Sequence, residues 1–288
     1  MPEERALVFP CHGAALVGIL SLPAPGSTPS TRGVLVVVGG SQYRAGSHRQ
    51  FTLLARDLAA AGIPAMRFDY RGMGDSEGEL QDFEGAGDDL RAAIDRFMLE
   101  VPGMSEVVLW GLCDGASAAA MYAPQDARVA GLVLLNPWVR TEEGAARATI
   151  KHYYRDRLFD ARLWKKVVSG RFDVKNSVRS LWTNVGKAFG PSVPNEEAQT
   201  DAQPAPLPER MLAALDSFKG RALVVLSGAD LTAQEFADLS SRPGAWQRLL
   251  DAPRFTRRRI DKADHTFSRR PWQDQVSNWT RDWLRSWS

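Results

Sequence analysis

The segment that most constrains the fold is an apolar run that leads directly into a glycine-flanked cysteine. Residues 106–119 read Glu-Val-Val-Leu-Trp-Gly-Leu-Cys-Asp-Gly-Ala-Ser-Ala-Ala. This is a predicted buried strand, then Gly111-x-Cys113-x-Gly115, then small helix-forming residues. The order strand, turn, helix is typical of a nucleophile elbow, here with cysteine in the place where serine is usual. The turn is so sharp that side chains two positions before and after the nucleophile would collide, which explains the two glycines.

Cys113 has two interpretations. A lone buried cysteine is usually an inert, small apolar residue. At an elbow, by contrast, the sulfur lies at the start of a helix, where backbone N–H groups and the helix dipole favour a thiolate. The flanking strand and the Ala-rich helix favour the elbow. On this interpretation the segment predicts acyl transfer through a thioester on Cys113.

Strands alternate with helices from Val34 onward, which predicts an α/β fold with a mostly parallel central sheet and helices on both faces. An N-terminal hairpin is expected around Cys11-His12-Gly13. The expected later strands are Gly33–Val38, Ile63–Phe68, Glu106–Trp110, Val129–Leu135, Arg221–Leu226 and Arg254–Ile260. The expected helices are Gln50–Ala61, Asp82–Glu100, Gly115–Tyr122, one from Thr232, and Pro271–Trp287. Trp272, Trp279, Trp283 and Trp287 recur at helical spacing in the last helix, which indicates core packing.

The alternation breaks between Pro137 and about Ser217, where the chain is polar and carries scattered aromatic residues. The stretch Gly190–Pro208 is rich in Pro, Ala, Gln and Glu, which is typical of a loop. We therefore predict a core formed by residues 1–136 and 218–288, with a helical lid inserted at 137–217. Ordinary connecting helices are the alternative.

Composition excludes several classes of function. The net charge of the 288 residues is +2, from 36 basic and 34 acidic side chains, so no strong field attracts nucleic acid or an anionic membrane. The Arg257-Arg258-Arg259 run lies in an expected strand and is interpreted as a solvated edge. Two cysteines make no disulfide framework, no signal peptide is visible, and no run of about 18 apolar residues could span a membrane. The expected location is the cytoplasm, where a free thiol persists.

A cysteine nucleophile needs a base, and an acid that orients this base. In this fold the chain order is nucleophile, acid, histidine, each in a loop at the carboxyl edge of the sheet. Four histidines are present, at positions 12, 48, 152 and 265. Only His265, which follows the strand ending at Ile260, has the required order and loop position. It is the predicted catalytic base.

The predicted acid is Asp230, just after the strand Arg221–Leu226. Helix capping is its alternative role, but Thr232-x-x-Glu235 has the pattern of a capping box, which would leave Asp230 free for His265. Asp264 is the second candidate. We rank it lower because neighbours in sequence rarely aim their side chains at one another.

The oxyanion hole needs two backbone N–H groups. One is expected from Asp114, whose carboxylate would itself disfavour a neighbouring thiolate and is expected to interact with the helix N-terminus. The other is expected from Gly39-Gly40-Ser41-Gln42, where glycines let the backbone approach substrate. Ser41 and Gln42 both stay open as donors, with Gln42 favoured. This chemistry uses a small-molecule acyl substrate and requires neither cofactor nor metal ion.

These segments together resemble the α/β-hydrolase superfamily over about 1–135 and 218–288. The likeness rests on Gly39-Gly40, on Gly111-Leu-Cys113-Asp-Gly115, and on Phe68-Asp-Tyr-Arg-Gly-Met-Gly-Asp-Ser-Glu-Gly78. The last resembles the Asp-x-Arg-Gly-x-Gly-x-Ser loop of that fold. The variable insertion of the superfamily would then be the lid.

Four segments further resemble the exosortase A system-associated hydrolase, type 1. They are Gly40-Ser-Gln-Tyr-Arg-x-Gly-Ser-His-Arg-Gln-Phe51, Gly111–Gly115, Ser227-Gly-Ala-Asp-Leu-Thr232 and Asp264-His-Thr-Phe267. The resemblance implies a bacterial cytoplasmic hydrolase or acyltransferase linked to surface polysaccharide. It also implies proline where this chain has Ser41, and because proline has no N–H to donate, Gln42 is the favoured donor.

Three functions follow from these residues. The leading one is hydrolysis of an acyl ester or thioester through a Cys113 acyl-enzyme. The second is acyl transfer from the same intermediate to an amine, thiol or alcohol, with the lid controlling access of water. The third is a non-catalytic binding protein, which would be expected to lack a triad member. Dehalogenase and epoxide hydrolase chemistry is excluded because it needs a carboxylate at position 113.

Overall fold

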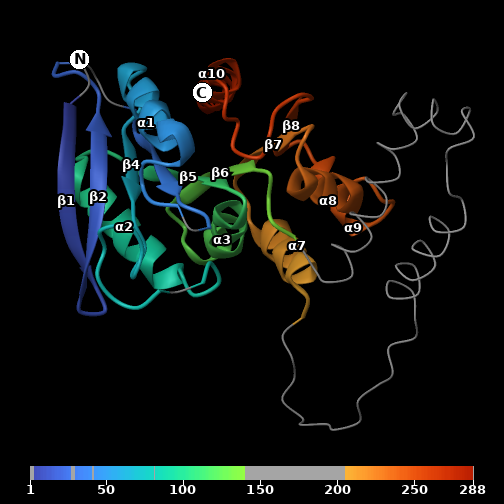
Figure 1. The fold of residues 1–288 in the computed structure, drawn as a ribbon, viewed down its shortest axis with the longest axis horizontal. Coiled ribbons are helices and arrows are strands. Elements are labelled where there is room, and N and C mark those ends of the chain that lie inside the picture. The colour runs from blue at the N-terminus through green and yellow to red at the C-terminus, as the bar shows by residue number, and fades with distance from the viewer. Residues whose placement is uncertain (1–2, 27–29, 41, 81, 140–204, 288) are drawn as a thin grey trace, which may run out of the picture. The chain divides into compact units, whose positions relative to one another are not determined.

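An eight-stranded sheet forms the centre of the protein. The computed structural model describes residues 3–26, 30–40, 42–80, 82–139 and 205–287. The strand order is β1-β2-β4-β3-β5-β6-β7-β8 (Figure 1). β2 pairs antiparallel with both β1 and β4, and all other pairs are parallel. The strands are β1 (Glu3–Cys11), β2 (Ala14–Leu22), β3 (Arg32–Val37), β4 (Ala65–Phe68), β5 (Glu106–Leu112), β6 (Val129–Leu135), β7 (Arg221–Ser227) and β8 (Phe255–Ile260). The predicted α/β fold with a mostly parallel sheet is confirmed.

Helices cover both faces of this sheet. α1 and α10 contact each other on one face, while α2 and α3 lie on the other (Figure 1). The helices are α1 (Gln50–Ala60), α2 (Gly87–Glu100), α3 (Asp114–Tyr122), α7 (Leu207–Ser217), α8 (Leu231–Ser240), α9 (Ala245–Leu250) and α10 (Arg270–Arg285), with short 3-10 turns η1 (Ser47–Arg49) and η2 (Ala123–Gln125). In the described part of the chain, no helix is long and apolar enough to cross a membrane.

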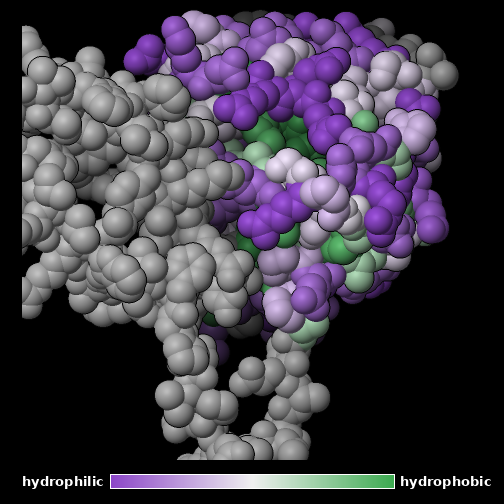
Figure 2. Space-filling view, turned by 90° about the vertical axis from the view of Figure 1, so that its right-hand side faces the viewer, coloured by the Kyte–Doolittle hydropathy of each residue, from purple (hydrophilic) through white to green (hydrophobic). Residues whose placement is uncertain are grey.

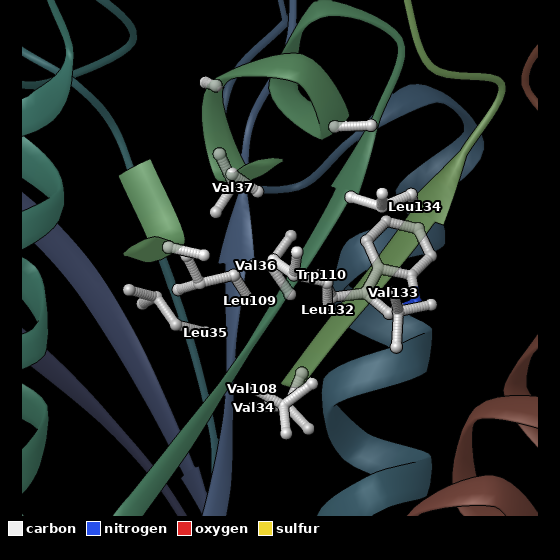
Figure 3. Close-up of a cluster of buried hydrophobic side chains, with 14 of the residues drawn as sticks. Val34, Leu35, Val36, Val37, Val108, Leu109, Trp110, Leu132, Val133 and Leu134 are labelled. Carbon is white, nitrogen blue, oxygen red and sulfur yellow. The ribbon is translucent and has the colours of Figure 1, made fainter. Parts of the chain in front are cut away.

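The core is built on the three central strands β3, β5 and β6. Their side chains are buried on both faces of the sheet (Figure 3), which explains the continuous apolar runs in the sequence. Trp110 of β5 packs edge-on against Phe51 of α1, and its indole N–H donates to the Thr280 hydroxyl of α10 at 3.3 Å. Val276 and Trp283 are buried, and Trp272, Trp279 and Trp287 pack against the core, so the expected role of the tryptophan stripe is confirmed.

Several element boundaries differ from the sequence-based expectation. α2 begins at Gly87 and not at Asp82, because the Gly85 N–H donates to both the carbonyl and the carboxylate of Asp82 and closes a turn there. α9 was not predicted. α7 lies inside the range assigned to the lid, yet Met211 and Leu215 of α7 are fully buried in the core.

The described residues include most of the predicted core but only the two ends of the predicted lid. Met1–Val139 and Pro208–Ser288 form one compact unit. Residues 140–204, which make up most of the predicted lid at 137–217, lie outside the described residues. The lid therefore stays a prediction.

The edge strand β8 carries three exposed arginines. The Arg257 guanidinium pairs with Asp251 at 2.6 Å, and that of Arg259 pairs with Asp261 at 2.9 Å. The expected solvated edge is confirmed. Figure 2 views the molecule from the β8 side, where hydrophilic residues surround smaller apolar areas.

Candidate active site

Cys113 lies at the turn between β5 and α3. Its backbone has φ 61° and ψ −126°, a conformation that non-glycine residues rarely adopt. It is the N-cap residue of α3, and its side chain is partly buried. The sulfur therefore lies at the N-terminus of α3, as the elbow interpretation expects.

The two flanking glycines are needed for space. A Cβ on Gly111 would lie 2.4 Å from the Gly115 carbonyl oxygen, and one on Gly115 would lie 2.5 Å from the Val37 carbonyl oxygen. Gly39 is equally close to the elbow, since a Cβ added to it would lie 2.4 Å from the Leu112 carbonyl oxygen. The end of β3, the elbow and the start of α3 are thus packed backbone against backbone.

His265 lies in the loop after β8. Its Nδ1 is 3.0 Å from Asp230 Oδ2. The pKa of His265 is raised to about 10, chiefly by the hydrogen bond to Asp230 and next by one to Cys113, against the opposing effect of burial. The imidazole therefore lies between the carboxylate and the sulfur, and these two contacts favour its charged form. The structure brings Cys113, His265 and Asp230 together.

Asp230 has two partners at once. It is the N-cap residue of α8, and its Oδ2 accepts the Ala233 N–H at 2.9 Å while the same oxygen contacts His265. The expected capping box was wrong, because α8 begins at Leu231 and Thr232 and Glu235 lie within it. The sequence argument treated capping and orienting as alternatives, but one carboxylate oxygen makes both contacts.

The other titratable candidates have different surroundings. The Asp264 carboxylate accepts hydrogen bonds from the Ser268 N–H and hydroxyl. Burial raises the pKa of Asp264, but these hydrogen bonds outweigh burial and the pKa is lowered. Exposed His12 pairs with Asp88 at 2.8 Å, His48 is exposed in η1, and His152 lies outside the described residues.

The two proposed oxyanion donors border the same cleft. Gln42 and Asp114 line a cleft of about 550 Å³ together with Met73, Leu80 and Phe83. The Gln42 side chain accepts the Ser47 N–H at 3.2 Å, and the Asp114 carboxylate accepts the Gly115 N–H at 3.0 Å, as expected for an acid at a helix start. Ser41 lies outside the described residues. No group of three His, Cys, Asp or Glu side chains within those residues is placed to hold a metal ion.

A buried ion pair, which the sequence did not reveal, fixes the loop that carries Gln42. Asp69 is fully buried, and it accepts the Arg44 N–H at 2.6 Å, the Arg44 guanidinium, and the Asp75 N–H at 3.1 Å. This joins the loop after β3 to the loop after β4. The sequence did not indicate this role of Arg44, because its partner Asp69 is distant in the sequence.

Comparisons with solved structures show the fold. An esterase from Pyrococcus furiosus has 15% identity and a TM-score of 0.65, with 99% of this chain and 93% of that chain covered. Est1E from Butyrivibrio proteoclasticus, solved with ferulic acid bound, has 15% identity and a TM-score of 0.62, with 98% of both chains covered. An α/β serine hydrolase without a lid from Xanthomonas campestris has 20% identity and a TM-score of 0.58, with 99% of this chain and 95% of that chain covered. No curated protein matches the sequence.

A family model gives the classification. The model described as serine aminopeptidase, S33, matches residues 29–179, which is more than half of the chain. The matched region includes β3, the elbow and β6, and it carries cysteine at position 113. The chain therefore belongs to the serine aminopeptidase S33 family and is a hydrolase of the α/β-hydrolase type.

Proposed function

We propose that this hydrolase cleaves carboxylic esters or thioesters through an acyl-enzyme on Cys113. The observation that carries the proposal is the position of the His265 imidazole, whose Nδ1 lies 3.0 Å from Asp230 Oδ2 and whose pKa is raised by hydrogen bonds to Asp230 and to Cys113. A serine nucleophile would need a neutral histidine to remove its proton, whereas a thiolate beside an imidazolium is already activated.

In the first half of the reaction, the Cys113 thiolate attacks the acyl carbon. The carbonyl oxygen becomes an oxyanion that accepts hydrogen bonds from the backbone N–H groups of Asp114 and Gln42. As the C–O or C–S bond to the leaving group breaks, the His265 imidazolium gives it a proton. A thioester on Cys113 and a neutral imidazole remain.

In the second half, neutral His265 takes a proton from water while the water oxygen attacks the thioester carbon. The C–S bond breaks, the carboxylic acid leaves, and the thiolate and imidazolium are restored. Asp230 keeps Nδ1 of the ring directed away from the sulfur in both halves.

The cleft beside the elbow supports a small, largely apolar acyl group. Met73, Leu80 and Phe83 supply its apolar lining, and none of the lining residues that the structure describes is a lysine or arginine. An uncharged acyl chain would bury its surface there, whereas an anionic group would face the Asp114 and Asp82 carboxylates.

The test is intact mass after incubation with a panel of activated acyl esters and thioesters. We expect one acyl adduct on wild type, none on Cys113→Ala, and a rate loss of at least about 10⁴-fold in that variant. Cys11→Ala is the matched control, because burial and a hydrogen bond to Asp89 raise the pKa of Cys11 to about 11 and make that thiol inert. Full turnover in Cys113→Ala would refute the mechanism.

We also propose the cytoplasm as the location and bacterial surface polysaccharide as the biological context. The support is the resemblance to the exosortase A system-associated hydrolase in four segments, together with two free cysteines. Growth of a deletion strain with and without the intact gene, with exopolysaccharide quantified, tests this context. Equal polysaccharide in the two strains would contradict it.

A further inference from the structure

A fully buried asparagine follows β6. Asn136 has a left-handed backbone, with φ 44°, and no exposed surface. Its Nδ2 donates to the Ser227 hydroxyl at 2.8 Å and to the His265 carbonyl at 2.9 Å, while its Oδ1 accepts the Ser227 N–H at 2.8 Å. The Ser227 hydroxyl in turn donates to the Asp264 carbonyl at 2.8 Å. The Asn136 amide thus connects the end of β7 to the backbone of the loop after β8 that carries His265, the histidine loop.

The residues around Asn136 hold the nucleophile. The Cys113 N–H donates to the Leu135 carbonyl at 2.9 Å, and the Cys113 carbonyl accepts the Trp138 N–H at 3.2 Å. Residues 135–138 therefore contact the Cys113 backbone on one side and the His265 backbone on the other. No shorter connection between these two backbones is present among the described residues' hydrogen bonds.

We propose that Asn136 is a positioning residue, which sets the separation of the Cys113 sulfur and the His265 imidazole. This inference rests on the proposed function. It adds a residue that touches neither substrate nor reacting atoms and that acts through the backbone of the histidine loop.

Few side chains could replace this amide. A left-handed backbone is tolerated by glycine and asparagine, and glycine has no side chain to bond His265. An ionised aspartate could still accept the Ser227 N–H but has no N–H for the His265 carbonyl. An apolar residue would leave the buried Ser227 N–H and the carbonyl of His265 without partners.

The test compares Asn136→Gly with Tyr122→Phe, both in a Cys11→Ala background. Tyr122→Phe also removes one buried hydrogen bond, to Asp126, but at the far end of α3, about 12 Å along the helix from the elbow. The readouts are kcat, KM, and the pH dependence of the rate at which iodoacetamide alkylates Cys113.

Asn136→Gly keeps the backbone conformation accessible and removes the amide. We expect kcat to fall about 10- to 100-fold with KM nearly unchanged, because a small displacement of a catalytic group has effects of this size. The pH midpoint of alkylation should rise, because an imidazole displaced from the sulfur stabilises the thiolate less. Tyr122→Phe should lower the melting temperature and leave the midpoint in place.

Ser227→Ala gives a second test if Asn136→Gly does not fold. It removes the hydroxyl between Asn136 and Asp264 and should shift the alkylation midpoint in the same direction by a smaller amount. A wild-type midpoint in the folded variants, or an equal shift in Tyr122→Phe, overturns the inference. If wild type turns over no ester but the midpoint shifts as expected, the proposed function fails and the role of Asn136 in positioning stands.

Discussion

At the scale of single residues, the use of sulfur at position 113 is the main question. The hydroxyl of serine is a far weaker acid than the thiol, so a serine variant would depend on a neutral His265. Hydrogen bonds to Asp230 and Cys113 raise the pKa of His265 to about 10, which favours its protonated form. In the proposed mechanism, this charged form favours a thiolate over a hydroxyl as the nucleophile.

Cys113→Ser should keep measurable acyl-ester turnover at a reduced rate, with its optimum at higher pH, where His265 becomes neutral. It should also transfer less acyl group to an added amine or thiol, relative to water, than wild type does. A partition assay with both acceptors measures this ratio. A serine variant that matches wild type would mean a serine-hydrolase site with a tolerated exchange. An unchanged ratio would mean that the cysteine confers no preference for transfer.

Asp230→Asn should reveal the His265 pair in the free energy of unfolding. The variant keeps a side-chain oxygen for the Ala233 N–H, so the cap of α8 is retained. Because the pKa of His265 rises from 6.5 to about 10 on folding, the pair stabilises fully below pH 6.5, and this stabilisation is lost as the pH rises through 10. Urea unfolding at pH 6 and pH 10 should show a larger gap between wild type and variant at pH 6. An equal gap at both pH values would contradict the charged histidine.

At the scale of elements, the elbow couples β3, β5 and α3 through glycines. Gly115→Ala should destabilise the protein by roughly 3 kcal/mol, because its Cβ would meet the Val37 carbonyl oxygen at 2.5 Å and backbone atoms cannot rotate away. Gly62→Ala is the matched control. Its φ is +89° with no atom within 4 Å, so only the left-handed conformation opposes alanine, at about 1 kcal/mol. Melting temperatures of the two variants show which substitution destabilises more. An equal decrease in both would mean that the elbow backbone shifts to accommodate the Cβ of alanine at position 115.

The elements that the sequence predicted well are those set by local pattern. Continuous apolar runs predicted the central strands, and Gly111-x-Cys113-x-Gly115 predicted the elbow, because those features depend on neighbouring residues. The start of α2 was misplaced, since the Gly85 N–H donates to the carboxylate and the carbonyl of Asp82 and closes a turn there.

In the candidate site, position along the chain pointed to Cys113, Asp230 and His265, which lie together in the structure and whose catalytic roles stay a prediction. Position along the chain was not enough to find Asn136, whose partners are 91 and 129 residues away in the sequence. An asparagine directly after a buried strand at the carboxyl edge was the available signal. The shared oxygen of Asp230 also could not be foreseen, because it depends on where α8 begins.

At the scale of the whole molecule, β8 is an edge of the sheet among the strands that the structure describes. Exposed edge strands pair with other chains unless charge prevents it, and Arg257–Arg259 supply that charge. Arg258→Val should increase self-association, as measured by sedimentation velocity across a concentration series. Arg242→Val makes the same change of charge in an exposed turn away from the sheet and should stay as wild type. Association in both variants would assign the effect to charge alone.

The order of strands also determines when the thiol becomes reactive during refolding. Cys113 follows β5, Asp230 follows β7 and His265 follows β8, and these strands become neighbours only through successive parallel pairings. Parallel pairings join distant parts of the chain and form slowly. After dilution from urea, the far-ultraviolet circular dichroism signal should recover before Cys113 regains the alkylation rate of the native protein. Recovery of the alkylation rate of Cys113 would then report when the strands that carry Cys113, Asp230 and His265 have assembled.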